Sequence, residues 1–282
     1  MPSEIKWKIR DDYTKALRES EISKEEYKRL AINFGIVSDS YDEGNRNEAD
    51  MSNELTDRVL KMLQESFLGK PIRVLLLGCG PGTVEYSILR EYGGDDLENV
   101  EVHAVDLSAK MLDIAKQYGF NVYVHDMKDR IPKEAPQKYD AIIWMGSFMH
   151  VLYPGVSSEE ADLQRANLLK RYYDALLPGG QMIIESFYAH GESSAWEYAR
   201  VPIIDGVPNK EDRLLFYLRD FNLKDLERLG RNAEIPRENV QLFFTDRHAT
   251  QEGIIYCSID EIRRNPPPQY EQATMMLINL VK

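Results

Sequence analysis

The chain has 282 residues, of which 43% are hydrophobic, enough for one large α/β domain or one such domain with a smaller cap. Its 35 basic and 47 acidic residues give a net charge of −12, which repels phosphate backbones and disfavours nucleic acid as a partner. No apolar run approaches the roughly 18 residues of a membrane span, and the first residues lack the apolar core of a signal peptide. The two cysteines form neither a disulfide framework nor a metal-ligand spacing. We therefore expect a cytoplasmic protein without a membrane partner or a metal site.

The first 70 residues predict a helical cap, or lid. Residues 1–50 are highly charged and are expected to form short helices. Ser23-Lys-Glu-Glu26 is a capping box, which begins a helix with its apolar side chains on one face. A longer helix is predicted from near Ser52, because apolar residues recur there at helical spacing.

From residue 72 onward, strands and helices alternate. Strands are predicted at residues 72–77, 100–105, 121–124, 141–145 and 181–187. Helices are predicted from the turn after the first strand to about Tyr92, from Ser108 to Tyr118 and from Glu159 to Leu177. Continuous apolar strands that alternate with helices are typical of a parallel sheet covered on both faces. The pattern predicts an α/β fold with a Rossmann-like, doubly wound and mostly parallel sheet.

The pattern is weaker after the fifth strand. Residues 188–220 fit no clear element and are expected to form an insertion within a Rossmann-like domain of residues 71–282. A helix follows from Asn222 to Leu229, and two last strands are predicted at residues 240–245 and 275–281.

The strongest functional signal is a glycine-rich turn after the first buried strand, Val74-Leu-Leu-Leu-Gly78-Cys79-Gly80-Pro81-Gly82-Thr83. Glycine permits a positive φ and lets a ligand approach the backbone closely. Open α/β folds bind ligands at this end of the sheet. The spacing is G-x-G-x-G, and the third glycine of a dinucleotide-binding turn would fall at Thr83, which argues against a nicotinamide-dependent oxidoreductase.

This turn resembles the first motif of the class I S-adenosylmethionine-dependent methyltransferases, and the resemblance continues in order along residues 72–187. It implies that Asp106 binds the ribose hydroxyls of the cofactor and that Asp126 binds the adenine amino group. It also implies that Met127 packs on the adenine ring and that the end of the fourth strand lies beside the sulfonium. The implied cofactor site consists of Gly78, Cys79, Gly80, Gly82, Asp106, Leu107, Asp126, Met127, Met145 and Gly146.

Two positions concern the methionine end of the cofactor. Tyr41 resembles an aromatic residue that many small-molecule methyltransferases place over the cofactor, where cation–π attraction favours the sulfonium. A solvated loop tyrosine is the alternative. The family often has an acid where this chain has Leu76, so the cofactor's amino group is held by another residue or by backbone carbonyls.

Methyl transfer from a sulfonium is a direct displacement, and a protein base is needed only if the acceptor must lose a proton. His150, shortly after the fourth strand, is the candidate base, and a structural hydrogen bond is its alternative role. The sequence favours a small-molecule acceptor methylated on oxygen or nitrogen. A protein or RNA methyltransferase and a non-catalytic nucleoside-binding module are the alternatives.

Overall fold

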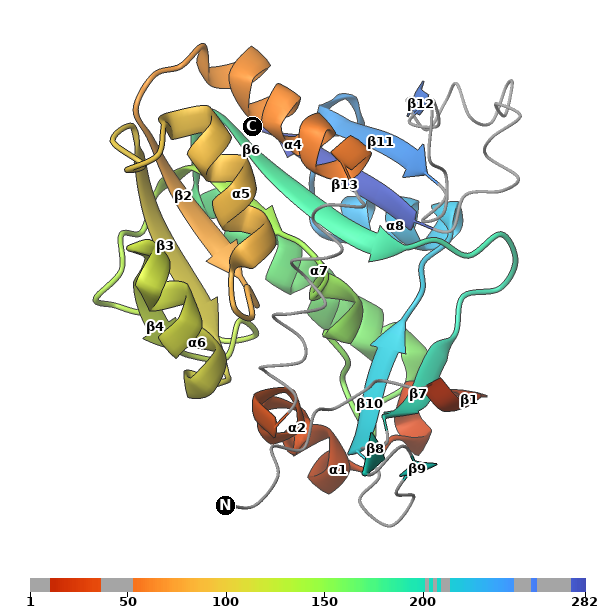
Figure 1. Ribbon diagram of the computed structural model, residues 1–282. Coiled ribbons are helices and arrows are strands. Elements are labelled where there is room, and N and C mark those ends of the chain that lie inside the picture. Colours follow the sequence, from red (N-terminus) through yellow and green to blue (C-terminus); the bar gives the residue numbers. More distant parts are fainter. Residues whose placement is uncertain are drawn as a thin grey trace.

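The computed structural model describes residues 11–36, 53–200, 203–204, 207–208, 214–245, 255–257 and 275–282 (Figure 1). Within these ranges, none of the helices combines the length and the apolar character that a membrane crossing requires.

The larger of the sheets has eight strands in the order β12-β11-β13-β6-β5-β2-β3-β4. Its strands are β2 (Ile72–Leu77), β3 (Val100–Asp106), β4 (Asn121–Val124), β5 (Tyr139–Trp144), β6 (Leu176–Phe187), β11 (Val240–Thr245), β12 (Ile255–Cys257) and β13 (Met275–Val281). Strands β6, β5, β2, β3 and β4 are parallel, and β13, β11 and β12 join their edge in antiparallel pairings. The predicted Rossmann-like, mostly parallel sheet is confirmed.

Helices cover both faces of this sheet (Figure 1). They are α4 (Asn53–Phe67), α5 (Thr83–Gly93), α6 (Ala109–Ala115), α7 (Ser158–Ala175) and α8 (Leu223–Asn232). The side chains of β2 alternate between two cores: Leu76 packs with α4, α5 and α6, whereas Leu75 packs with α7 and α8. Helix α4, which we predicted within the cap, therefore lies on the large sheet.

A smaller antiparallel sheet was not predicted. It pairs β1 (Asp11–Leu17), β7 (Ala195–Arg200) and β10 (Leu214–Arg219) in the order β1-β7-β10, and β8 (Ile203–Ile204) pairs separately with β9 (Val207–Pro208). The expectation of short helices throughout residues 1–50 was wrong for β1, because its conformation depends on pairing with a strand about 180 residues away. The insertion after the fifth strand of the Rossmann-like pattern contains β7 to β10.

Two short helices follow β1 and a 3-10 helix, η1 (Glu19–Glu21). Helix α1 (Lys24–Lys28) begins as predicted, with the Glu26 backbone N–H donating to Ser23 Oγ at 3.3 Å. Helix α2 (Leu30–Ile36) follows it, and the side-chain amide of Asn33 donates to the Leu215 carbonyl in β10 at 2.8 Å. We call α1 and α2 the lid.

Buried charges connect the N-terminal segment to both sheets. Glu19 is 1% exposed and forms ion pairs with Arg165 of α7 and, at 3.1 Å, with Arg219 of β10. Arg165 also pairs with Asp162 at 2.8 Å, and the Tyr153 backbone N–H donates to the Glu19 carboxylate at 2.8 Å. These contacts fix the start of the lid against α7 and β10, and we call them the Glu19 network.

Candidate active site

The turn between β2 and α5 requires glycine at more than one position. Gly78, Gly80 and Gly82 have φ values of 57°, 54° and 71°, in the left-handed region. A Cβ on Gly78 would lie 2.5 Å from Ser147 Oγ, and one on Gly82 would lie 2.9 Å from the Phe120 ring. The first of these close approaches brings the glycine turn directly against the segment that follows β5.

Asp106, the last residue of β3, holds this turn to the start of α6. Its Oδ2 accepts the Gly80 backbone N–H at 2.9 Å, and its Oδ1 accepts that of Ser108 at 2.8 Å. Burial raises the pKa of Asp106, and these backbone donors counteract part of that rise. The Leu107 backbone N–H is a third donor to this carboxylate, which has about four lone-pair sites and so keeps some capacity to accept from a ligand.

The residues after β4 form a tight loop that is fixed from α7. Asp126 Oδ1 accepts the Lys128 backbone N–H at 2.8 Å. The Tyr172 hydroxyl donates to the Met127 carbonyl at 2.7 Å, and Arg171 donates to the Lys128 carbonyl at the same distance. The side chain of Met127 reaches the glycine turn, where its Cε would lie 3.0 Å from a Cβ on Gly78.

The end of β5 completes the group of strand ends. Ser147 Oγ donates to the Leu77 carbonyl at 2.7 Å, which ties the segment after β5 to the end of β2. Met145 is 9% exposed, and Gly146 has a φ of 64°. Among the described residues, no atom lies within 4 Å of a Cβ placed on Gly146, so the space in front of it is open. The residues predicted after β2, β3, β4 and β5 therefore lie at the carboxyl end of one sheet.

The lid contacts the segments that follow three of these strands. A Cβ on Gly35 would lie 3.1 Å from Ser108 Oγ, just after β3. Lys128, after β4, places its Nζ 4.4 Å from the centre of the Tyr27 ring. The Tyr27 hydroxyl donates to the His150 carbonyl, after β5, at 2.7 Å. The lid thus covers the end of the sheet where the predicted cofactor residues lie.

His150 is oriented by a backbone carbonyl of the insertion. It lies in the 3-10 helix η3 (Phe148–His150), and its Nδ1 is 2.5 Å from the Tyr217 carbonyl of β10. A carbonyl only accepts, so Nδ1 carries the hydrogen and the lone pair of the neutral ring is on Nε2. The Phe34 ring of the lid packs edge-on against the imidazole, with centroids 5.2 Å apart. A structural hydrogen bond and a base on Nε2 are therefore compatible roles.

The remaining predicted cofactor residues are Tyr41, Leu107 and Cys79. Tyr41 lies outside the described residues. Leu107 is 44% exposed at the edge of the site. Cys79 is buried, burial raises the pKa of its thiol, and its Sγ points to the Gly80 carbonyl at 3.4 Å. A buried and protonated thiol is a poor nucleophile. We therefore assign ligand contact to the backbone of Cys79 and not to its thiol.

Sequence reasoning missed two charged residues at this site. Glu85, in the first turn of α5, is 5% exposed, and burial raises its pKa to about 8, with the charges of Glu185 and Asp106 adding to the rise. The sequence pattern could have indicated its burial, because Glu85 lies at helical spacing from Ile88 and Leu89 on the inward face of α5. Lys128 is the second, a half-buried lysine whose pKa is lowered by burial, and no sequence pattern indicates its contact with the lid.

Residues 74–180 match a family model described as a methyltransferase domain. No curated protein matches the sequence. Solved structures with a similar fold include a 1,6-didemethyltoxoflavin-N1-methyltransferase from Burkholderia thailandensis, bound to 1,6-didemethyltoxoflavin and S-adenosylhomocysteine. It is 17% identical, with 95% of this chain and 94% of that chain covered and a TM-score of 0.54.

Two further similar structures are S-adenosylmethionine-dependent methyltransferases. One, from Thermotoga maritima and described as a possible histamine N-methyltransferase, is 15% identical, with 90% of this chain and 100% of that chain covered and a TM-score of 0.56. The other, from Clostridium acetobutylicum, is 12% identical, with 80% and 89% covered and a TM-score of 0.52. At these identities the likeness shows the fold. The family match assigns residues 74–180 to a methyltransferase domain, and the likeness to these structures shows that the chain has the fold of S-adenosylmethionine-dependent methyltransferases.

Proposed function

We propose that this enzyme transfers a methyl group from S-adenosylmethionine to an oxygen or nitrogen atom of a small molecule, in the cytoplasm. The observation that supports this most directly is the Asp106 carboxylate, which is held to the glycine turn through Gly80 at 2.9 Å and lies beneath the lid. We propose a small methyl acceptor because the lid contacts the segments after β3, β4 and β5. These contacts restrict access to that end of the sheet.

The residues present fit the nucleoside end of the cofactor. The Asp106 carboxylate keeps acceptor capacity beyond its backbone contacts, and we assign it to the ribose hydroxyls. Asp126 keeps Oδ2 for the adenine amino group, since the Lys128 backbone occupies only Oδ1. Met127, already packed towards the glycine turn, would cover the ring, and Leu107 would flank it.

The methionine end requires a different set of residues. We assign the backbone of Gly78, Cys79, Gly80 and Gly82 to its carboxylate side, and Met145 and Gly146 to the open space in front of β5. Tyr41 stays our candidate for an aromatic cover.

We assign the amino group to Glu85, which replaces the acid missing at Leu76. Both residues belong to the segment around the glycine turn, and the Glu85 carboxyl is buried close enough to Cys79 and Asp106 for their charges to interact. A cation placed beside it would favour its ionised form.

When bound, the cofactor supplies a methyl group on a sulfonium, which is already a good leaving group. The protein's task is then to hold the acceptor in line and to exclude water. His150 Nε2 accepts the proton of an acceptor O–H or N–H, and the Tyr217 carbonyl keeps the ring in the tautomer whose lone pair is on Nε2.

The test is calorimetric titration with S-adenosylmethionine, S-adenosylhomocysteine and NAD, followed by a screen of small acceptors for methyl transfer. We expect both sulfur nucleosides to bind and NAD not to bind. Asp106→Ala should weaken both by on the order of 10- to 100-fold, since hydrogen bonds to a charged group are lost. Asp113→Ala, which removes an exposed acid from α6, is the matched control and should bind normally. An unchanged affinity in Asp106→Ala would contradict the cofactor assignment.

A further inference from the structure

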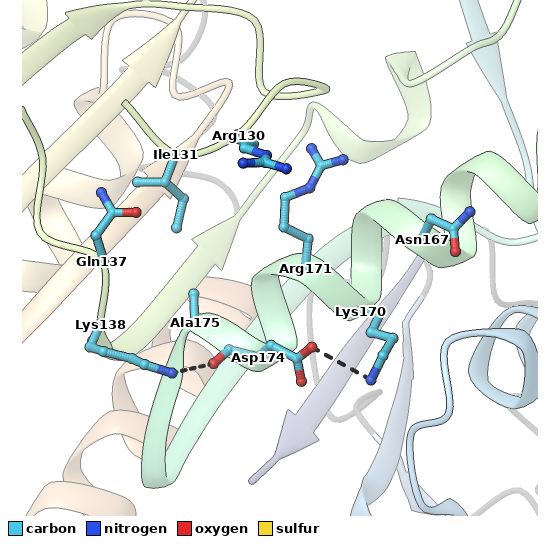
Figure 2. Close-up of a pocket in the computed structure, with 9 residues that line it drawn as sticks. All are labelled: Arg130, Ile131, Gln137, Lys138, Asn167, Lys170, Arg171, Asp174 and Ala175. Atoms are coloured by element: carbon cyan, nitrogen blue, oxygen red, sulfur yellow. Dashed lines mark hydrogen bonds and ion pairs between the residues drawn. The ribbon is translucent and has the colours of Figure 1, made fainter. Parts of the chain in front are cut away.

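A second pocket lies on the outer side of the loop that contains Asp126 and Met127. It is an open pocket of about 480 Å³ between the β4–β5 connection and helix α7 (Figure 2). The methyltransferase site does not use it. Its charged lining residues are Arg130, Lys138, Lys170, Arg171 and Asp174.

This lining is basic in a chain that is acidic as a whole. Four of the five charged residues are cations, whereas the chain has 35 basic and 47 acidic residues. A concave surface lined by charge of one sign concentrates ligands of the opposite sign. The pocket is therefore suited to an anion.

Several of these cations keep an uncompensated charge. Lys138 Nζ donates to the Asp174 carbonyl at 2.7 Å, and Arg171 donates to the carbonyls of Lys128 and Asp129, so both contact neutral acceptors. Within the described part of the chain, neither Arg130 nor Arg171 forms an ion pair. The half-buried guanidinium of Arg171, which contacts carbonyls, and the exposed guanidinium of Arg130 therefore keep their attraction for an anion.

Lys170 differs from the other cations of the pocket. It lies 3.5 Å from the Asp174 carboxylate and 3.2 Å from that of Glu234, so its charge is balanced within the protein. We therefore exclude it from the proposed contacts. The contribution of the pocket to anion binding then comes from Arg130, Arg171 and Lys138.

We propose that this pocket binds a phosphorylated small molecule. Figure 2 shows the guanidinium groups of Arg130 and Arg171 at the same end of the pocket, with Lys138 towards the other. Planar guanidinium groups match the oxygens of a phosphate in pairs, and a lysine adds a point charge. This set of cations therefore favours a compact ligand with two or more negative charges. The net charge of −12 disfavours a nucleic-acid backbone as the source of the phosphates.

The same arginine connects this pocket to the cofactor loop. Arg171 and its neighbour Tyr172 hold the backbone carbonyls of Met127, Lys128 and Asp129, the residues that follow Asp126. A ligand that fixes the Arg171 side chain also fixes this loop, so the two sites should bind with positive coupling. Coupling of binding is reciprocal, so each ligand raises the affinity of the other by the same factor. This coupling rests on the proposed function, whereas the pocket's own ligand does not.

The experiment titrates inorganic pyrophosphate into the full chain by calorimetry, with and without saturating S-adenosylhomocysteine. We expect binding to the unaltered protein and a loss of about tenfold or more in Arg130→Gln. Arg130 is exposed, so this change does not threaten the fold. Lys133→Gln is the matched control, because it removes the same charge from an exposed position of the same connection that does not line the pocket. Saturation with S-adenosylhomocysteine should raise the pyrophosphate affinity about three- to tenfold.

The outcomes separate the claims. Absence of pyrophosphate binding, or equal losses in Arg130→Gln and Lys133→Gln, overturns the anion site. Tighter binding of a single-stranded RNA oligomer than of pyrophosphate, with the same sensitivity to Arg130→Gln, overturns the small-molecule ligand. An equal pyrophosphate affinity with and without the nucleoside overturns the coupling. Failure of S-adenosylhomocysteine to bind at all would instead contradict the proposed function, and the pyrophosphate titration would still be read on its own.

Discussion

Replacing Glu85 with glutamine should change how the stability of the ligand-free protein depends on pH. Burial raises the pKa of this carboxyl from 4.5 to about 8. Between these values the native protein binds a proton that the unfolded chain releases, so the free energy of unfolding falls as the pH rises. A shift of this size corresponds to about 5 kcal/mol at 1.36 kcal/mol per pKa unit, and the loss is complete above about pH 8. Glutamine does not titrate, so the free energy of unfolding of Glu85→Gln does not fall in this way as the pH rises.

The measurement is urea denaturation of the two proteins from pH 5 to pH 9.5, followed by circular dichroism. The free energy of unfolding of Glu85→Gln, relative to the unaltered protein, should increase by several kcal/mol between pH 5 and pH 9. Glu91→Gln removes an exposed acid from the same helix and should show a difference that does not change with pH. A pH-independent difference for Glu85→Gln would refute the claim that this carboxyl is buried and protonated in the fold.

The same variant tests the assignment of the cofactor's amino group. Glu85→Gln should weaken binding of S-adenosylmethionine and S-adenosylhomocysteine about tenfold or more near neutral pH, where the charged amino group of the ligand favours the ionised carboxyl. Methylthioadenosine lacks the amino group, so its affinity should stay within about twofold. Equal losses for all three nucleosides would mean that Glu85 supports the glycine turn and does not contact the amino group.

Three further substitutions test the base, the buried charges and the turn. For an acceptor that loses a proton, His150→Asn should lower kcat on the order of 10²- to 10⁴-fold and leave the cofactor affinity unchanged. A variant with undiminished kcat would mean that His150 has only a structural role. Glu19→Gln removes one of the two acids that pair with both Arg165 and Arg219, and it should lower the free energy of unfolding by about 3–5 kcal/mol in urea. A loss below about 1 kcal/mol would contradict a buried ion pair of Glu19. Gly78→Ala should lose cofactor binding by calorimetry because its Cβ meets Ser147, while Gly119→Ala, with a similar φ and open space, should retain it.

The large sheet could be predicted because its signal is local. Strand β2 occupies the six residues predicted for it, Ile72–Leu77, since a continuous apolar run between helices is itself the signature of a doubly covered strand. The end of α7 shows the limit of local reasoning. The helix was predicted through Leu177 but ends at Ala175, because Leu176 pairs with Tyr139 of β5 and begins β6.

The small sheet could not be predicted, since its strands depend on partners that are distant in sequence. Asp11–Leu17 pairs with Ala195–Arg200, and neither segment has the alternation of a strand that buries one face. At the candidate site, the strand-end acids were accessible to sequence reasoning because topology brings strand ends together. The inward position of Glu85 could have been inferred from the helical spacing of α5, whereas the state of Lys128 depends on its contact with the lid, which no spacing indicates.

Strand β10 explains why the lid and the candidate base should act together. Among the described strands it pairs with β7 alone and lies at the edge of the small sheet, so every second carbonyl along its other edge is not used by a described strand. Two of these carbonyls are used: that of Leu215 accepts Asn33 of the lid at 2.8 Å, and that of Tyr217 accepts His150 at 2.5 Å. Two residues further, the Arg219 side chain binds Glu19. One strand therefore sets the position of the lid, the orientation of His150 and the anchor of the N-terminal segment. A change of register in β10 would displace all three, so acceptor specificity and proton transfer should vary together among variants of this insertion.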